Sequence, residues 1–298
     1  MQTATIVRRL SLTGPLGPHI VAGATKGQSM QGLKRTYQRA AGLLVATLIA
    51  VTGCATVPDT ERRQVLLLSP QDEVRLGLEA FDQVRDELDL IESGPEKERV
   101  ERIGERIVAA ASNRLRDRGF DSLEWEFHVV EDDQVNAFVL PAGKIVFYTG
   151  LLDLAADDDE VAAVMGHEVA HVVARHAGER ISQNVLIQMG LGAAAVALSD
   201  PQSPRGQATM AALGLGAQVG VQLPFSRIHE AEADEIGLFM MAEAGYDPRA
   251  AVSFWDRMDE MAGDRPPTFL STHPGPEQRR DKLESLMPRA LAIYEQQS

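Results

Sequence analysis

The sequence predicts an α+β fold that is mainly helical and contains one small sheet. Helix-start signals recur along the chain, as at Ser69-Pro70, where a capping side chain, a proline and an acidic first turn follow one another. Strand patterns are confined to the alternating stretch 123–130 and a hairpin over 135–149. A helix that begins near Asp159 follows this hairpin directly, so we expect it to pack on the sheet.

The composition fits one globular domain and disfavours nucleic-acid binding. The chain has 298 residues, of which 44% are hydrophobic and 24% charged, and its formal net charge is −14. Residues 1–53 contain six Lys and Arg and no Asp or Glu, so all the acidic residues lie in the remainder. Phosphate binding needs the opposite sign of charge, and we expect no nucleic-acid partner.

Residues 167–171 read His-Glu-Val-Ala-His within the predicted helix. Positions i and i+4 share one helix face, so the imidazoles of His167 and His171 can close on a single metal ion. Glu168 is rotated about 100° from His167 and can reach a water molecule beside the ion, which is the place of a general base. This spacing predicts a catalytic zinc site with one ion per chain.

A catalytic zinc takes three protein ligands, so a third must come from elsewhere. The extended metzincin pattern is excluded, because Ala174 and Ala177 stand where it needs Gly and His, and His176 would point about 140° away from His171 on a continuous helix. A second helical segment, 226–237, offers Glu230 and Asp234 at i and i+4. One of these carboxylates can bind the ion while the other accepts the N–H of a ligand histidine.

Four motifs in one order resemble the gluzincin peptidases related to HtpX and the CAAX prenyl proteases. They are the N-A-F…P-x-G hairpin over 136–143, the H-E-x-x-H helix, the E-x-x-A-D segment over 230–234, and S-T-H-P over 271–274 with Arg279 after it. The resemblance runs from about residue 66 to 285. It implies a zincin-like metallopeptidase fold, in which the helix carrying H-E-x-x-H packs a small sheet.

The same resemblance implies roles for individual residues. Glu230 would be the third zinc ligand, and Asp234 would support a ligand histidine. His273 would stabilise the negative charge that develops on the scissile carbonyl, and Arg279 would hold its loop or a nearby carboxylate. A substrate strand would pair with the sheet edge at Asn136, Ala137 and Phe138; Phe138 is equally well explained as a core residue.

The basic N-terminal region predicts a targeting segment. An apolar run of signal-peptide length, 40–50, follows three basic residues and leads to Cys54, the only cysteine. Small residues directly before this cysteine resemble a bacterial lipobox, so we expect Cys54 to carry a lipid. Counting from Met30 gives a normal signal length, which favours Met30 as the start. Ala55 suggests sorting to the periplasmic side of the outer rather than the inner membrane.

The predicted organisation is therefore a signal region over 1–53, a tether over 54–68 and a peptidase domain over 69–298. Residues 157–160 are explained by the positive end of a helix dipole rather than by a cation site. Residues 185–223 predict two helices and a turn, either a packed hairpin or a glycine-softened lid.

We expect a zinc metalloendopeptidase that hydrolyses internal bonds of unfolded or misassembled envelope proteins. The family resemblance supplies this class of substrate. A rival interpretation is an assembly factor that holds unfolded strands in the same cleft with little hydrolysis. The presence of Glu168 favours the enzyme, because binding alone needs no base. A storage or structural zinc site would need a fourth Cys or His ligand.

Overall fold

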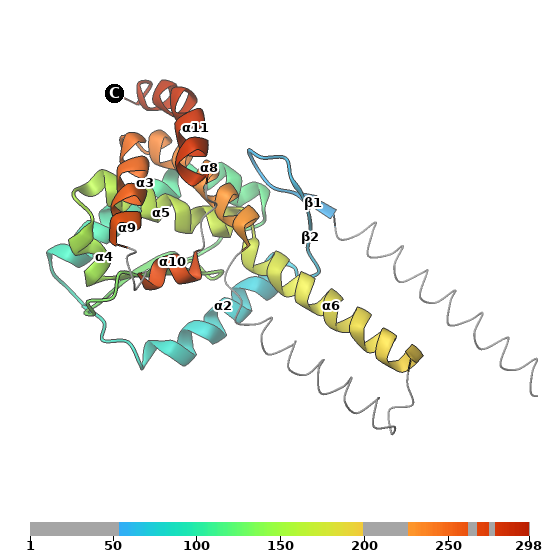
Figure 1. The fold of residues 1–298 in the computed structure, drawn as a ribbon. Coiled ribbons are helices and arrows are strands. Elements are labelled where there is room, and N and C mark those ends of the chain that lie inside the picture. Colours follow the sequence, from blue (N-terminus) through green and yellow to red (C-terminus); the bar gives the residue numbers. More distant parts are fainter. Residues whose placement is uncertain (1–53, 199–225, 262–266, 274–277, 298) are drawn as a thin grey trace, which may run out of the picture. The chain divides into compact units, whose positions relative to one another are not determined.

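The structure is a computed structural model that describes residues 54–198, 226–261, 267–273 and 278–297 (Figure 1). The predicted signal region and residues 199–223 of the predicted two-helix stretch 185–223 lie outside the described residues. No helix in the described part of the chain has both the length and the apolar character needed to cross a bilayer.

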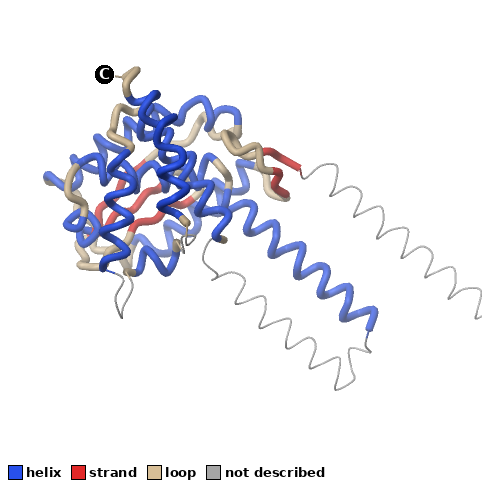
Figure 2. Tube along the Cα trace, turned by 45° about the horizontal axis from the view of Figure 1, so that its top comes forward, coloured by secondary structure: helices blue, strands red, loops and turns tan. Residues whose placement is uncertain are grey.

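Helices form most of the described chain and surround a small sheet (Figure 2). This confirms the mainly helical α+β fold that the sequence predicts. In chain order the helices are α2 (Pro70–Arg85), α3 (Pro95–Asp117), α4 (Thr149–Leu154), α5 (Asp158–Val173), α6 (His176–Leu198), α8 (Arg227–Glu243), α9 (Arg249–Met261), α10 (Thr268–Thr272) and α11 (Arg279–Tyr294).

The three-stranded sheet has the order β3 (Glu126–Val130), β5 (Lys144–Tyr148) and β4 (Ala137–Leu140). β4 and β5 form the predicted antiparallel hairpin, and β3 runs parallel to β5. The outer edge of β3 is covered, because the N–H of Ile91 donates to the carbonyl of Val129 at 2.8 Å. Within the described part of this three-stranded sheet, β4 therefore presents the open edge.

Both faces of the sheet are covered by helices. On one face, Phe127, Ile145 and Phe147 join the main core with α3 and α5. On the other, Val130 and Val146 pack against Phe81 and neighbouring residues of α2. Successive side chains of a strand point to opposite faces, so β5 has to be apolar along nearly its whole length.

Local signals set the helix starts. Ser69 accepts a hydrogen bond from the N–H of Asp72, and Ser226 accepts one from the N–H of His229. Asp157 caps α5, and the carboxylate of Glu160 reaches back to the N–H of Ala156 at 2.7 Å. This reciprocal cap explains the acidic run better than a cation site does. α2 ends at Arg85, and the chain then turns to form the bridge that covers β3.

Helices α5 and α8 cross at two glycines beside the H-E-x-x-H motif. A Cβ on Gly166 would lie 2.8 Å from the carbonyl oxygen of Gly237, and a Cβ on Gly237 would lie 2.8 Å from the backbone of Gly166. Only glycine permits so close a backbone approach. The close crossing brings the ligand candidates of the two helices together.

The segment 54–68 differs from the expected tether. It contains a two-stranded antiparallel ladder of β1 (Cys54–Thr56) and β2 (Arg63–Val65), with Val57 and Gln64 buried. The side-chain amide of Gln64 donates to the carbonyl of Ala174 at the end of α5, at 2.8 Å. This β1–β2 hairpin therefore packs against the helix that carries the metal motif.

Candidate metal centre

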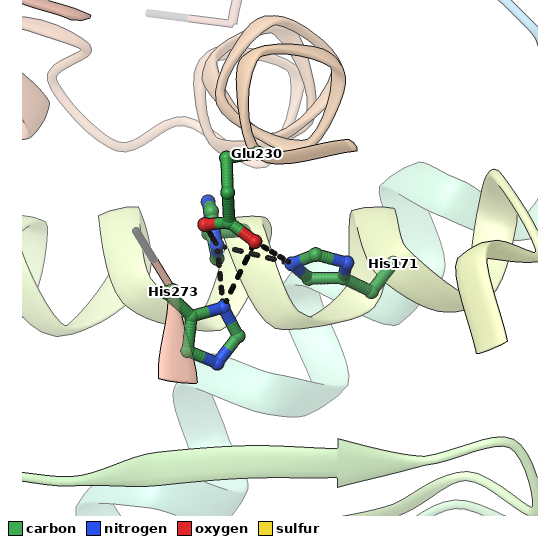
Figure 3. Close-up of side chains that lie close together, drawn as sticks. His171, Glu230 and His273 are labelled. Carbon is green, nitrogen blue, oxygen red and sulfur yellow. Dashed lines mark hydrogen bonds and ion pairs between the residues drawn. The ribbon is translucent and has the colours of Figure 1, made fainter. Parts of the chain in front are cut away.

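Four buried side chains from three parts of the fold converge on one point. His167 and His171 come from α5, Glu230 from the first turn of α8, and His273 from the residue that ends α10. Each exposes 3% of its surface or less. Figure 3 shows Glu230 reaching from its helix toward His171 and His273.

The spacing of the donor atoms fits a metal ion. His167 Nε2 lies 3.1 Å from His171 Nε2, 3.3 Å from His273 Nδ1 and 3.3 Å from Glu230 Oε2. Ligand atoms placed tetrahedrally at zinc bonding distances are about 3.3 Å apart. The geometry therefore suits an ion of zinc's size and ligand preference.

The hydrogen bonds around the two α5 histidines leave their Nε2 atoms as the metal-facing donors. His167 Nδ1 lies 3.0 Å from Asp234 Oδ1, so the proton on Nδ1 is the one that this carboxylate holds. Burial lowers the pKa of His167, but Asp234 and Glu230 outweigh it and raise the value to about 10. The carboxylates thus favour positive charge at this point, which a bound cation would supply.

Glu230 is held from behind by Arg279. The Arg279 guanidinium lies 3.2 Å from Glu230 Oε2 and 2.6 Å from Asp234 Oδ2, and it stacks 3.7 Å above the Trp255 ring. Burial raises the pKa of Glu230, but His167 and His273 outweigh it and hold the value well below its usual range. Glu230 Oε1 lies 3.6 Å from His171 Nε2 and 3.4 Å from His273 Nδ1, so both oxygens of this carboxylate adjoin the donor group.

Glu168 lies next to the donor group, at the open edge of the sheet. Burial raises the pKa of its carboxyl, and the N–H of Val139 in β4 donates to it. Its Oε1 has no hydrogen-bond partner within the described segments, and His273 Nε2 lies 3.7 Å away. A buried carboxylate with one uncommitted oxygen beside a metal site is placed to exchange a proton with a bound water.

The structure corrects the expectation that His176 points away from His171. α5 ends at Val173, and Arg175 takes a left-handed conformation with φ 58°, so the helical angle does not continue to residue 176. His176 begins α6 instead, and its Nδ1 lies 2.9 Å from His171 Nδ1. The exclusion of the metzincin pattern is unaffected.

Of the predicted edge residues, Ala137 and Phe138 lie on β4 and Asn136 directly precedes it, and they present different groups. Asn136 accepts from the N–H of Tyr148, so alternate residues starting from it direct their backbone groups toward β5. Ala137 and Val139 therefore direct theirs to the open side. Phe138 packs with the Phe81 cluster on the face away from α5, which is a core role for its side chain.

A family comparison decides the class of this centre. The model of peptidase family M48 matches residues 95–287, which is more than half of the chain. The chain belongs to peptidase family M48. Its E-x-x-A-D and H-E-x-x-H segments both lie inside the matched range, and the metal-donor group falls there as well.

Curated relatives include mitochondrial and bacterial proteases. The chain is 38% identical to mitochondrial metalloendopeptidase OMA1 of Schizosaccharomyces pombe, over 78% of this chain and 66% of the relative. It is 44% identical to the OMA1 of Arabidopsis thaliana over 58% of this chain and 34% of the relative. It is 29% identical to the beta-barrel assembly-enhancing protease of Escherichia coli over 85% and 54%. The chain thus spans about a third to two thirds of their lengths.

Sequence reasoning missed several residues that contact the M48 site. His176 and Glu232 lie behind His171, and Trp255 and Phe269 form an aromatic wall beside His167 and His273. The density of carboxylates in the 230–235 segment was the only signal for Glu232. Trp255 is at a spacing that also suits core packing, and it does join the core.

Proposed function

We propose that this chain is a zinc-dependent metalloendopeptidase with one zinc ion, held by His167, His171 and Glu230. The observation that carries the proposal is the buried group of metal donors with Glu168 beside it at an open strand edge. Two imidazoles and one carboxylate form one of the three-ligand sets that hold catalytic zinc. When bound, the ion would polarise a water molecule and the scissile carbonyl.

Glu168 acts as the general base in this proposal. Its uncommitted Oε1 takes a proton from the attacking water and then gives it to the leaving amine. Burial raises the pKa of this carboxyl, which brings it closer to neutral pH and makes the carboxylate a stronger base toward the attacking water. The N–H of Val139 holds the carboxylate in place during both transfers.

Arg279 and His273 complete the proposed machinery. Arg279 fixes both Glu230 and Asp234, so one guanidinium orients a zinc ligand and the carboxylate that supports another. Negative charge builds on the carbonyl oxygen during peptide hydrolysis, and a donor is needed opposite the metal. The His273 imidazole, 3.7 Å from Glu168, is the proposed donor.

The open edge of β4 is the proposed site for the substrate backbone. Ala137 and Val139 direct their peptide groups away from β5, and the N–H of Val139 is taken by Glu168, so a segment in extended conformation can pair with the remaining backbone groups of this edge. The edge adjoins Glu168 through Val139. A site that reads backbone groups favours unfolded or loosely folded chains, which can offer an extended segment.

Misfolded or misassembled envelope proteins are the proposed physiological substrates. Support comes from the name of the bacterial relatives, beta-barrel assembly-enhancing protease, and from the lipobox-like sequence before Cys54.

We propose that Cys54 is lipidated and holds the domain on the periplasmic side of the outer membrane. Cys54→Ala should then move the full chain from the membrane fraction to the soluble fraction of cells. Retention in the membrane fraction would reject the lipid anchor.

Digestion of an unfolded protein tests the proposed activity. The full chain, incubated with reduced and denatured casein or lactalbumin, should produce internal fragments. A chelator should stop the cleavage, and added zinc should restore it. A strand-holding assembly factor would bind the unfolded protein without fragmenting it, so intact substrate in the presence of zinc would favour that alternative.

A further inference from the structure

Behind His171 lies a largely buried set of polar side chains that the proposed reaction does not use; its two members from the β1–β2 loop are partly exposed. We call it the Glu232 cluster. It joins the β1–β2 hairpin, α6 and α8, and its members are Thr60, Arg62, His176, Glu179, His229 and Glu232. Burying this many charged groups costs free energy unless they are paired, which raises the question of what they support.

The metal site determines which ring nitrogen of each histidine in this chain of hydrogen bonds carries the proton. His171 Nε2 faces His167 Nε2 and Glu230, so its lone pair belongs to the metal. The proton of a neutral His171 is then on Nδ1 and is donated to His176 Nδ1 at 2.9 Å. His176 must carry its own proton on Nε2, which lies 3.2 Å from Glu232 Oε2.

Arg62 fixes the far end of this chain. Its Nε lies 2.7 Å from Glu232 Oε2, and its terminal nitrogens lie 2.8 Å and 2.6 Å from the two oxygens of Glu179. A guanidinium that bridges two carboxylates holds both in one orientation. Thr60 adds a hydrogen bond to Glu232 Oε1.

The loop between β1 and β2 carries Thr60 and Arg62, and it adopts a backbone conformation that costs free energy. Asp59 and Glu61, on either side of Thr60, have φ of 64° and 55°, a left-handed conformation that non-glycine residues seldom adopt. Gln64 then ties β2 to the carbonyl of Ala174, two residues before His176. The hairpin is thus held in register with the end of α5.

The other α5 ligand has a matching but shorter arrangement. His167 contacts Asp234 directly, and Arg279 of α11 holds Asp234. Both supporting carboxylates come from α8, and each is paired with an arginine from a distant part of the chain. On the His171 side, a second histidine is interposed between the ligand and the carboxylate.

We propose that Arg62 is a positioning residue for the metal centre, acting on His171 through Glu232 and His176. The β1–β2 hairpin is then part of the machinery that orients a zinc ligand. The proposal rests on the zinc site of the proposed function, but not on any substrate. It therefore concerns metal affinity and ligand geometry in the first place.

Zinc affinity of full-length variants, measured by competition with a chromogenic chelator, tests this role. Removing groups that orient a ligand histidine typically weakens metal binding by about ten- to a hundredfold. We expect His176→Ala to fall in that range and Arg62→Ala to weaken zinc binding by at least about fivefold. Glu232→Gln keeps the shape of the side chain while removing its charge, and it should also weaken zinc binding. It therefore tests the same role if Arg62→Ala folds poorly.

Arg114→Ala is the matched control. Arg114 also joins the loop of the hairpin to α8, through Asp59 at 2.7 Å and Glu243 at 2.6 Å, without contacting His176 or Glu232. Both arginine variants should lower the thermal stability of the metal-free protein. Only Arg62→Ala should weaken zinc binding and shift the visible absorption bands of the cobalt-substituted protein, which report the ligand geometry.

A double variant separates action through His176 from general loosening. In the His176→Ala background, Arg62→Ala should cause no further loss of zinc affinity. The proposal is overturned if Arg62→Ala and Glu232→Gln bind zinc as tightly as the wild type, or if Arg114→Ala weakens binding equally. If the wild type binds no zinc, the proposed function fails together with this role. If the wild type binds zinc and the Arg62 and Glu232 variants bind it equally tightly, only the positioning role fails and the proposed function stands.

Discussion

At the scale of single residues, His273 contributes both ring nitrogens to the centre. Its Nδ1 lies 3.4 Å from Glu230 Oε1 and its Nε2 lies 3.7 Å from Glu168 Oε1. The ring stacks on Phe269 at 4.4 Å, which fixes its plane. It can therefore donate to the carbonyl oxygen of a substrate, or it can face the metal as a further ligand.

His273→Ala distinguishes these two roles. If His273 is an oxyanion donor, His273→Ala should lower kcat by about a hundredfold, the size typical of losing one such donor, while the zinc content stays complete. The measurement pairs single-substrate kinetics with metal analysis of the same preparation. Loss of zinc would make His273 a ligand, and unchanged cleavage would make it a structural residue.

The residues that sequence could identify are those whose partners lie within one helical turn or one motif. His167, Glu168 and His171 follow from helix geometry, and Glu230 with Asp234 formed a pair with two assignments left open. His176 could not be placed, because the left-handed Arg175 breaks the helix between it and His171. A single φ angle changed its direction from away from the metal to behind it.

At the scale of elements, the crossing of α5 and α8 determines the geometry of the centre. Gly237→Ala would put a Cβ against backbone atoms of Gly166 and His167 at 2.8 Å, so the helices would have to separate. We expect a loss of about 1–3 kcal/mol in the free energy of unfolding, which is the usual cost of overpacking, together with weaker zinc binding. Urea unfolding and chelator competition measure the two effects.

Gly104→Ala is the control for this substitution. Gly104 lies on α3, where a Cβ would meet the ring of Phe127 at 2.1 Å, and it does not adjoin the donor group. This variant should also lose stability but keep its zinc affinity within about twofold, because effects at distant sites are largely independent. Equal loss of zinc affinity in both variants would contradict a specific role for the α5–α8 crossing.

The β1–β2 hairpin gives a pH-dependent contribution to stability. Burial raises the pKa of Glu179 and Glu232, but hydrogen bonds from Arg62 and from the neighbouring histidines outweigh it and hold both values at about 2. The folded values lie below the unfolded ones. The stabilisation is therefore complete above the ordinary glutamate pKa near 4.5 and is lost as the pH falls toward 2.

Arg62→Ala should accordingly lower the free energy of unfolding more at pH 7 than at pH 3. Denaturant titrations at both pH values, with chelator present to remove any metal contribution, measure the difference. A destabilisation of equal size at the two pH values would mean that the Arg62 ion pairs contribute little and that its packing alone matters.

Local sequence signals predicted the helices and the hairpin well, whereas elements that depend on long-range contacts could not be predicted. The caps at Ser69, Asp157 and Ser226 and the hairpin before α5 are all encoded within a few residues. The expected tether over 54–68 showed no clear strand pattern, because β1 and β2 have three residues each. The two strands depend on contacts with α5 and α6 rather than on their own propensity.

At the scale of the whole molecule, the centre joins parts of the chain that lie far apart in sequence. Thr60 and Glu232 are separated by 172 residues, and Arg279 and Glu230 by 49. No periodic pattern in a single sequence reports such pairs. The family resemblance supplied Arg279 because it stands near a motif, whereas nothing marked Arg62.

The central claim is that Glu168 performs proton transfer while Glu230 holds the metal. Zinc content and cleavage of an unfolded protein, measured on the same preparations of Glu168→Gln and Glu230→Gln, test it most directly. Glu168→Gln should keep one zinc per chain and lose at least about a hundredfold in cleavage rate, whereas Glu230→Gln should lose zinc itself. Near-normal cleavage by Glu168→Gln, or full zinc in Glu230→Gln, would contradict the account.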